Sequence, residues 1–349
     1  MSSLQVLDLS GNQGLVELPP EIGILRTLQY LNLSLTSIRQ LPTGLANLRN
    51  LRCLLLDYNT NLKGIPPIVI SCLSLLQVYS KMNGVMDYFD EVEASADDEI
   101  AFLEVLEKMS CLNKICITIF AAPSVEMILN SFKLRHCIRK LTLMECSGLT
   151  SLLLISPEGA TSNRRKIEIF RNLTRFELFR CCSLKQIIMS DSLYLPNLHQ
   201  VYIGVCPLLL NLNCLAYAIN LKILTVLDCE SMEEIISESS EEEKAFPKLK
   251  TISLTRLRKL KSISRSPISS SSLFEIEVSQ CPSLKQLPLD IESADFLKKI
   301  RGETEWWEGL IWDREVVKDA CSSKFVSTSS SRFRPPGKTK DQISSTSKG

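Results

Sequence analysis

The chain has 349 residues and a formal net charge of +1, with 45% hydrophobic and 23% charged residues. This balance is globular rather than disordered, and near-neutral charge gives no general argument for binding nucleic acid or a membrane surface. No apolar run approaches the roughly 18 residues of a membrane span and no secretory signal is visible, so we expect a cytoplasmic protein.

A repeated frame begins near the N-terminus and recurs along the chain. It places apolar residues at Leu4, Leu7 and Leu9 and a polar residue at Asn12. Further frames start 24 and 23 residues later, at 28 and 51, and then at 138, 173, 198, 221, 249 and 273. This period is typical of leucine-rich repeats. We therefore predict an α/β solenoid, with a curved parallel sheet on the concave face and short helices and irregular turns on the convex face.

The frames divide the chain into segments. Residues 80–111 interrupt the period, and nine acidic and no basic residues lie between Asp87 and Glu107. Apolar spacing predicts a helix near 99–109 in this insertion, then a degenerate strand at Leu112, Ile115 and Ile117 and a helix across 124–134. The expected division is 1–79 (N-terminal repeats), 80–111 (acidic insertion and helix), 112–296 (C-terminal repeats), 297–325 (tryptophan-rich cap) and 326–349 (disordered tail).

The last place of the frame carries Asn or Cys in most repeats. Such a cysteine is a candidate metal ligand, half-disulfide, reactive thiol or buried scaffold group. Zinc usually needs paired, convergent ligands, whereas successive rungs would form a row of parallel side chains. We expect a structural ladder that bonds backbone groups left unpaired by the turn, made of Asn12, Asn59, Cys146, Cys181, Cys206, Cys229 and Cys281.

No sequence pattern indicates catalysis or a cofactor. His136 and His199 are the only histidines and lie on different predicted repeats, and no hydrolase, zinc-protease or phosphate-loop motif is present. The strand residues between the apolar places should line the concave face, where solenoids generally bind. The candidate partner-binding residues there form either a basic stripe with aromatic anchors or a set of ordinary solvated positions. They are Arg139, Lys140, Arg175, Phe179, Arg180, Tyr202, Lys222, Lys250 and Arg256.

Three segments resemble the leucine-rich-repeat region of plant intracellular nucleotide-binding disease-resistance proteins of the coiled-coil class. They are 18–57, the "FLEVLEKMSCLNKICITI" stretch with "RHCIRKLTLMECSGL", and the closing "LKKIRGETEWWEGLIWDREVVKDAC". The resemblance implies a protein ligand, either a pathogen effector or a modified host protein. It also implies a nucleotide-binding switch domain that the repeats restrain in cis or in trans and that this chain lacks.

The expected function is therefore a non-enzymatic protein-recognition module of a plant immune receptor. It would work without cofactor, metal, nucleic acid or membrane span. The alternative is a general leucine-rich-repeat interaction scaffold unrelated to defence. The strand that starts at Leu4 is expected to leave an apolar edge that preceding structure would cover.

Overall fold

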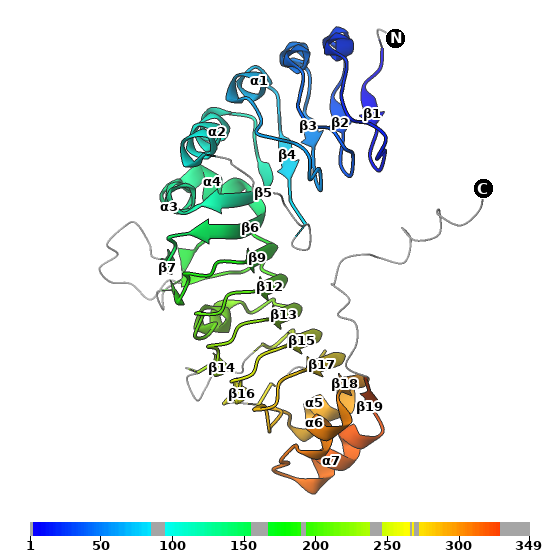
Figure 1. Ribbon diagram of the computed structural model, residues 1–349, viewed down its shortest axis with the longest axis vertical. Helices are drawn as coiled ribbons and strands as arrows, with labels where there is room; N and C mark the ends of the chain where they lie inside the picture. The colour runs from blue at the N-terminus through cyan, green and yellow to red at the C-terminus, as the bar shows by residue number, and fades with distance from the viewer. Residues whose placement is uncertain are drawn as a thin grey trace, which may run out of the picture.

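The computed structural model describes residues 3–84, 95–154, 167–189, 193–237, 246–265, 267–268 and 272–328 as an arc of stacked repeats (Figure 1). One sheet of 13 strands runs along the inner side of the arc. Each neighbouring pair in it is parallel. In order, its strands are β1 (Val6–Asp8), β2 (Tyr30–Asn32), β3 (Cys53–Leu55), β4 (Val78–Lys81), β5 (Lys114–Ala121), β6 (Ile138–Ser147), β9 (Arg175–Phe179), β12 (Gln200–Gly204), β13 (Ile223–Leu227), β15 (Thr251–Thr255), β17 (Glu275–Ser279), β18 (Lys299–Gly302) and β19 (Phe325–Ser327).

Short helices and three two-stranded sheets complete the repeats outside this sheet. The helices are η1 (Pro20–Ile24), η2 (Thr43–Asn47), α1 (Pro67–Ser71), α2 (Ala96–Lys108), α3 (Ala122–Asn130), α4 (Phe132–Cys137), η3 (Asn213–Tyr217), α5 (Ile291–Phe296), α6 (Thr304–Glu308) and α7 (Glu315–Ser322). The paired strands are β7 (Ser151–Leu154) with β10 (Gln186–Met189), β8 (Ile167–Glu168) with β11 (Leu193–Tyr194), and β14 (Glu234–Ile236) with β16 (Ser262–Ser264).

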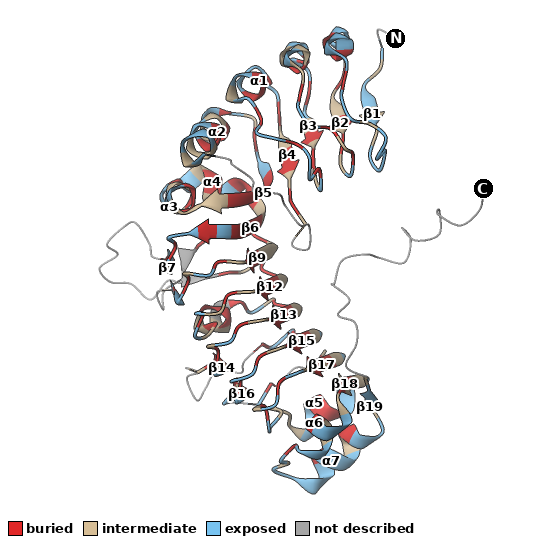
Figure 2. Ribbon diagram, viewed as in Figure 1, coloured by how far each residue is buried: buried red, intermediate tan, exposed pale blue. Residues whose placement is uncertain are grey.

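The predicted solenoid is confirmed, because every predicted frame coincides with a strand of the long sheet. Buried residues recur in successive repeats (Figure 2), since alternate strand residues point inward to one continuous core. The frame did not predict β4, where Tyr79 and Lys81 occupy places that hold leucine in the preceding repeat.

The helix predicted near 99–109 is α2, and its N-terminus is capped by the Ser95 side chain, which accepts a hydrogen bond from the amide of Asp98 at 3.1 Å. The helix predicted across 124–134 is instead two helices, α3 and α4. They meet at Ser131, whose backbone is extended and whose hydroxyl accepts a hydrogen bond from the amide of Leu134 at 3.1 Å. Such a serine starts a new helix and so ends the previous one.

The tryptophan-rich segment continues the stack and adds β18 and β19 to its end. Trp306 is buried, and its indole N–H donates to the carbonyl of Leu284 at 3.0 Å. The ring of Trp307 stacks on Phe325 with centroids 4.5 Å apart. A cap at 297–325 thus remains our assignment, with its aromatic side chains packed against the last repeats. Most of the expected disordered tail lies outside the described residues.

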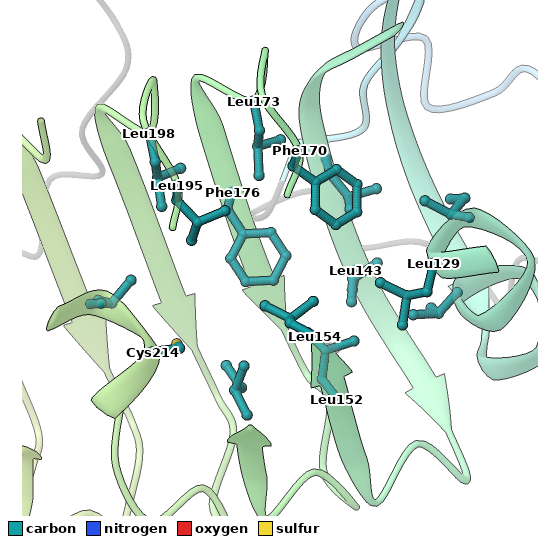
Figure 3. A pocket seen from close by; sticks show the side chains of 15 residues that line it. Leu129, Leu143, Leu152, Leu154, Phe170, Leu173, Phe176, Leu195, Leu198 and Cys214 are labelled. Carbon is teal, nitrogen blue, oxygen red and sulfur yellow. The ribbon is translucent and has the colours of Figure 1, made fainter. Parts of the chain in front are cut away.

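The core holds a small cavity of about 30 Å³ lined by side chains of β6, β7, β9 and β10 and of helices α3 and η3 (Figure 3). Leu143, Leu154, Phe170, Phe176 and Leu198 are among its lining residues. A lining of apolar side chains offers a water no hydrogen-bond partner. The cavity is therefore a packing gap of the core rather than a polar site.

Candidate protein-interaction surface

A left-handed residue ends most strands of the long sheet. In eight repeats the residue directly before the ladder place has φ between 52° and 59°, although none of them is glycine; they are Leu35, Tyr58, Glu145, Arg180, Val205, Asp228, Arg256 and Gln280. Such values are uncommon for residues with a side chain. Each one turns the chain inward and leaves its own side chain at the concave edge, so we call Glu145, Arg180, Val205, Asp228 and Arg256 the rim row.

The asparagine of the ladder bonds the turn of the previous repeat. Asn59 is buried, and its side-chain oxygen accepts from the amide of Thr36 at 2.8 Å while its amide donates to the carbonyl of Leu33 at 2.9 Å. Without Asn59 the amide of Thr36 would be unpaired inside the core, whereas the carbonyl of Leu33 also accepts from the Thr36 hydroxyl at 2.9 Å. Asn12 differs from the expectation of a buried group, because it is exposed. No turn lies beside it in the described sheet, where β1 is the edge strand.

The five ladder cysteines are buried free thiols. Their sulfurs approach carbonyls of the turn or of the previous rung; those carbonyls belong to Ile119 at 3.4 Å for Cys146, Leu143 at 3.5 Å for Cys181, Gly204 at 3.5 Å for Cys206, Leu227 at 3.4 Å for Cys229 and Ser279 at 3.4 Å for Cys281. Burial raises the pKa of Cys229 and of Cys281 to about 12. A scaffold role fits a thiol that is kept protonated.

The register of the long sheet defines three rows of side chains on its concave face. They run across β6, β9, β12, β13 and β15 as Lys140–Arg175–Gln200–Ile223–Thr251, Thr142–Glu177–Tyr202–Thr225–Ser253 and Met144–Phe179–Gly204–Leu227–Thr255. Lys140, Arg175, Phe179 and Tyr202 therefore lie where the concave prediction expected them.

The expected lateral stacking of Arg175 with Lys222 and Lys250 is wrong. Ile223 and Thr251 hold those places in the row of Arg175. The reason is that Lys222 and Lys250 directly follow the first leucine of their frames, whereas Arg175 stands two residues after Leu173. The carbonyl of His199 accepts from the amides of both Lys222 and Ile223, at 2.8 and 3.0 Å. Lys222, the first residue of this pair, therefore stands directly before strand β13. Lys250 and Thr251 share the carbonyl of Lys222 in the same way, and Arg139 holds the corresponding place in its own repeat.

Ion pairs neutralise much of the predicted basic stripe. Arg180 pairs with Glu145 at 2.9 Å, and Arg256 pairs with Asp228, so both pairs lie within the rim row. Arg175 pairs with Glu177, a buried carboxylate that also accepts from the Thr142 hydroxyl at 2.6 Å. Within the described ranges, Lys140, Lys222 and Lys250 are in no ion pair. The surface alternates in charge rather than being uniformly basic.

An apolar cluster separate from the core lies between these ion pairs. It consists of Met144, Phe179, Tyr202 and Leu227, with Phe120 and Val205 packed against it, and we call it the concave cluster. The rings of Phe179 and Tyr202 have centroids 6.4 Å apart, and the guanidinium carbon of Arg180 lies 5.2 Å from the ring centroid of Phe179. Gly204 makes this packing possible, because a Cβ there would lie 2.9 Å from one ring and 3.0 Å from the other.

The concave cluster contains one buried polar atom with an unmet hydrogen bond. Tyr202 is 5% exposed, and its hydroxyl has no hydrogen-bond partner among the described residues. Burial, with the nearby carboxylates of Glu177 and Asp228, raises its pKa, so the phenol stays protonated. A buried hydroxyl without a partner costs free energy. A ligand atom that reached it would recover that loss.

Several residues of this surface were not predicted from the sequence. Glu145 and Asp228 stand directly before ladder cysteines, and that place is the signal that would have put them on the rim. Glu177 and Gly204 have no such signal, because their roles depend on neighbours in adjacent repeats. In the described ranges, no three His, Cys, Asp or Glu side chains gather as a candidate metal site.

Comparison with known proteins places the chain in a family. A family model described as a leucine-rich repeat region matches residues 1–265, so the chain belongs to the leucine-rich-repeat family. It is 34% identical over 344 residues to Disease resistance protein RPS5 and 36% identical over 332 residues to Disease resistance protein SUMM2, both from Arabidopsis thaliana. The resemblance to the repeat region of plant disease-resistance proteins is thereby confirmed.

These alignments cover 96% and 90% of this chain but only 37% and 35% of the two relatives. The chain therefore spans about a third of their length. Among solved structures, the leucine-rich repeat domain of APL1B aligns over 95% of this chain and 90% of its own, with a TM-score of 0.47 and 13% identity. None of the helices in the described ranges is long and apolar enough to cross a bilayer.

Proposed function

We propose that this chain is the non-enzymatic recognition module of a plant immune receptor and binds a protein ligand on its concave face. The ligand would be a pathogen effector or a modified host protein. In the cytoplasm, the same repeats would restrain a nucleotide-binding switch domain, in cis or in trans. The similarity to disease-resistance proteins supports this role, and the matched family model names a repeat region rather than an enzyme.

The observation that carries the proposal is Val205, a partly exposed apolar residue that packs on the buried concave cluster and lies between two rim ion pairs. Protein-binding surfaces are typically organised as an apolar centre inside a polar rim. Here Glu145–Arg180 lies on one side of Val205 and Asp228–Arg256 on the other. The rim side chains of Arg180 and Arg256 are 35% and 41% exposed. They are therefore accessible to a partner, while the rings beneath hold their backbone in place.

The test reverses the polarity of the rim and keeps both ion pairs. One variant combines Glu145→Arg with Arg180→Glu and Asp228→Arg with Arg256→Glu. The matched control is Glu233→Lys with Lys261→Glu, because this pair is 2.7 Å apart and exposed but precedes the outer strands β14 and β16. The probes are a panel of purified effectors and the region of RPS5 that precedes the matched repeats, each titrated against the full chain.

The rim variant should weaken the binding of a partner by about tenfold or more, since charges that are complementary in the native complex become repulsive. The control should bind as the parent does, and both variants should melt cooperatively. A partner that binds the rim variant as tightly as the parent would contradict recognition through this face. If no effector or RPS5 fragment binds the parent protein, the assigned role in defence fails.

A further inference from the structure

The groove between α1, β4, β5 and α2 has a chemistry that concave-face recognition does not use. Its volume is about 300 Å³, at the lower end of the range for small-molecule sites. Apolar side chains form most of its wall, among them Ile65, Pro67, Phe102 and Phe120. The polar groups are few, and one of them is Lys81, which stands at an inward place of the repeat frame.

Lys81 occupies an inward-facing place of the repeat frame. It follows two residues after Tyr79, which is buried and packs its ring 5.4 Å from that of Phe102. Because strand side chains alternate, Lys81 points to the same side of β4 as Tyr79. In the neighbouring strands, the equivalent places hold the buried residues Leu56 and Ile117. A lysine here replaces an apolar side chain.

Two other partly buried lysines bond their ammonium groups to the backbone. Lys133 donates to the carbonyl of Glu107 at 2.6 Å, and Lys324 donates to that of Asp295 at 3.2 Å, each at the C-terminal end of a helix. The ammonium of Lys81 makes no hydrogen bond or close ion pair with any residue in the described ranges, although the groove also holds the carboxylates of Asp98 and of Glu99, whose charge acts on Lys81. A cation held in an apolar setting without a partner is costly, and such residues concentrate at functional sites.

Glu99 stands in the same groove but is already used. Its two carboxylate oxygens accept from the backbone amides of Phe120 and Ala121, at 2.9 and 3.0 Å, and so join α2 to the start of α3. Burial lowers the pKa of Lys81 and raises that of Glu99. The carboxylate is therefore committed to backbone donors, while the ammonium keeps its donors for another acceptor.

We propose that this groove binds a small molecule with a carboxylate head and a flat apolar body, and that Lys81 holds the carboxylate while Phe102, Phe120 and the prolines contact the body. A carboxylate is the acceptor that an ammonium binds most strongly, since both partners of the hydrogen bond carry charge. Planar aromatic rings suit walls built from Phe and Pro side chains. The site shares Phe120 with the concave cluster, while its remaining walls come from α1, α2 and the inward residues of β4 and β5.

The test is a calorimetric titration of the full chain with 2-naphthoate and, as its neutral counterpart of the same shape, 2-naphthamide. We expect saturable binding of one naphthoate per chain and about tenfold or more weaker binding of the amide, the difference expected for a charge-assisted hydrogen bond. This comparison needs no variant. Equal affinities for the two probes, or no saturable binding of naphthoate, would overturn the proposal.

A second arm assigns the charge to Lys81. The substitution Lys81→Met removes the ammonium but keeps an apolar chain of similar length, and it should reduce naphthoate binding to the level of the amide. Lys114→Met is the matched control, because Lys114 is an exposed lysine on the adjacent strand β5 and does not line the groove. Its binding should equal that of the parent. Undiminished naphthoate binding by Lys81→Met would overturn the assignment.

Discussion

A residue of one type has different roles in this molecule according to its place in the repeat. Asn12 and Asn59 occupy the same place of the frame, yet only Asn59 is buried and bonded to a preceding turn. Two basic residues likewise differ in their place: Arg175 lies in a concave row, whereas Lys222 directly precedes strand β13. The type of a residue therefore predicts the chemistry of its position, and its contacts with the adjacent repeat decide how that chemistry is used.

Replacing Asn59 by alanine should destabilise the protein by about 2 kcal/mol, because it removes two buried hydrogen bonds and leaves the buried amide of Thr36 without a partner. Asn12→Ala is the matched control at the exposed equivalent place and should change the stability by no more than about 0.5 kcal/mol. Chemical denaturation followed by circular dichroism measures both. Similar losses for the two variants would mean that the ladder bonds contribute little.

The ladder thiols should react slowly with a thiol reagent in the folded protein. Burial raises the pKa of Cys229 and Cys281 to about 12, so the reactive thiolate is scarce up to about pH 9. Cys72 and Cys182, which are exposed, should react fast and serve as the internal control. Mass spectrometry after timed labelling distinguishes these sites. Rapid native labelling of several ladder cysteines would contradict their burial.

Cys229 and Cys281 give the stability a dependence on pH. Burial raises their pKa in the folded chain above the ordinary value near 8.5, so the unfolded state releases these protons first as the pH rises. Their contribution to stability is therefore complete below about pH 8 and is lost progressively above it. A Cys229→Ala variant should show a weaker decline of the denaturation midpoint between pH 8 and pH 10 than the parent.

At the scale of the element, strands follow the frame closely and helices do not. The frame predicts strands because two inward leucines per rung leave a pattern that survives most substitutions. It missed β4 because Tyr79 and Lys81 interrupt the apolar series, and it missed β18 and β19 because Gly302 and Ser327 stand at the third apolar place. The break between α3 and α4 rests on the capping bond of Ser131, which apolar spacing alone does not reveal.

The candidate surface was only partly predictable for a similar reason. Alternation placed Lys140, Arg175, Phe179 and Tyr202 correctly on strands, but Lys222 and Lys250 stand one place earlier in the frame than Arg175 and so precede the rows. The ion pairs of the rim row join residues in adjacent repeats. No single repeat carries the information that its charge is neutralised by the next.

Packing between β9 and β12 should depend on the absence of a side chain at Gly204. Gly204→Ala would push a methyl group against the rings of Phe179 and Tyr202, and we expect a loss of about 1–3 kcal/mol from overpacking. Gly14→Ala is the matched control, since a Cβ there meets nothing within 4 Å. Denaturation midpoints compare the two. An equal effect at both glycines would show that the rings move aside freely.

At the scale of the whole molecule, stability accumulates from neighbour to neighbour. Each rung contacts chiefly the rungs beside it, so an uncovered end exposes a full cross-section of the core. The C-terminal end of the described sheet is covered by β18, β19 and helices α5 to α7. There the indole N–H of Trp306 donates a hydrogen bond to the carbonyl of Leu284. The last repeat should therefore depend on residues that do not follow the leucine frame.

Removing residues from 297 onward should lower the melting temperature and the solubility, because the unpaired edge of β17 and its apolar end would face water. A control that ends at residue 328 should melt as the full chain does. Scanning calorimetry and light scattering measure both effects. A shortened protein with the melting temperature of the full chain would show that the tryptophan segment is no cap.

The parallel register has a consequence for how such a surface changes. Residues that touch side by side on the concave face are far apart in the chain; Phe179 neighbours Gly204, and Tyr202 neighbours Thr225. No short peptide cut from this protein can therefore reproduce the surface. Loss or duplication of one complete repeat would keep every turn and ladder bond intact while bringing two previously distant columns of side chains into contact. Unequal exchange between repeats can thus compose a new recognition surface in one event, without any substitution.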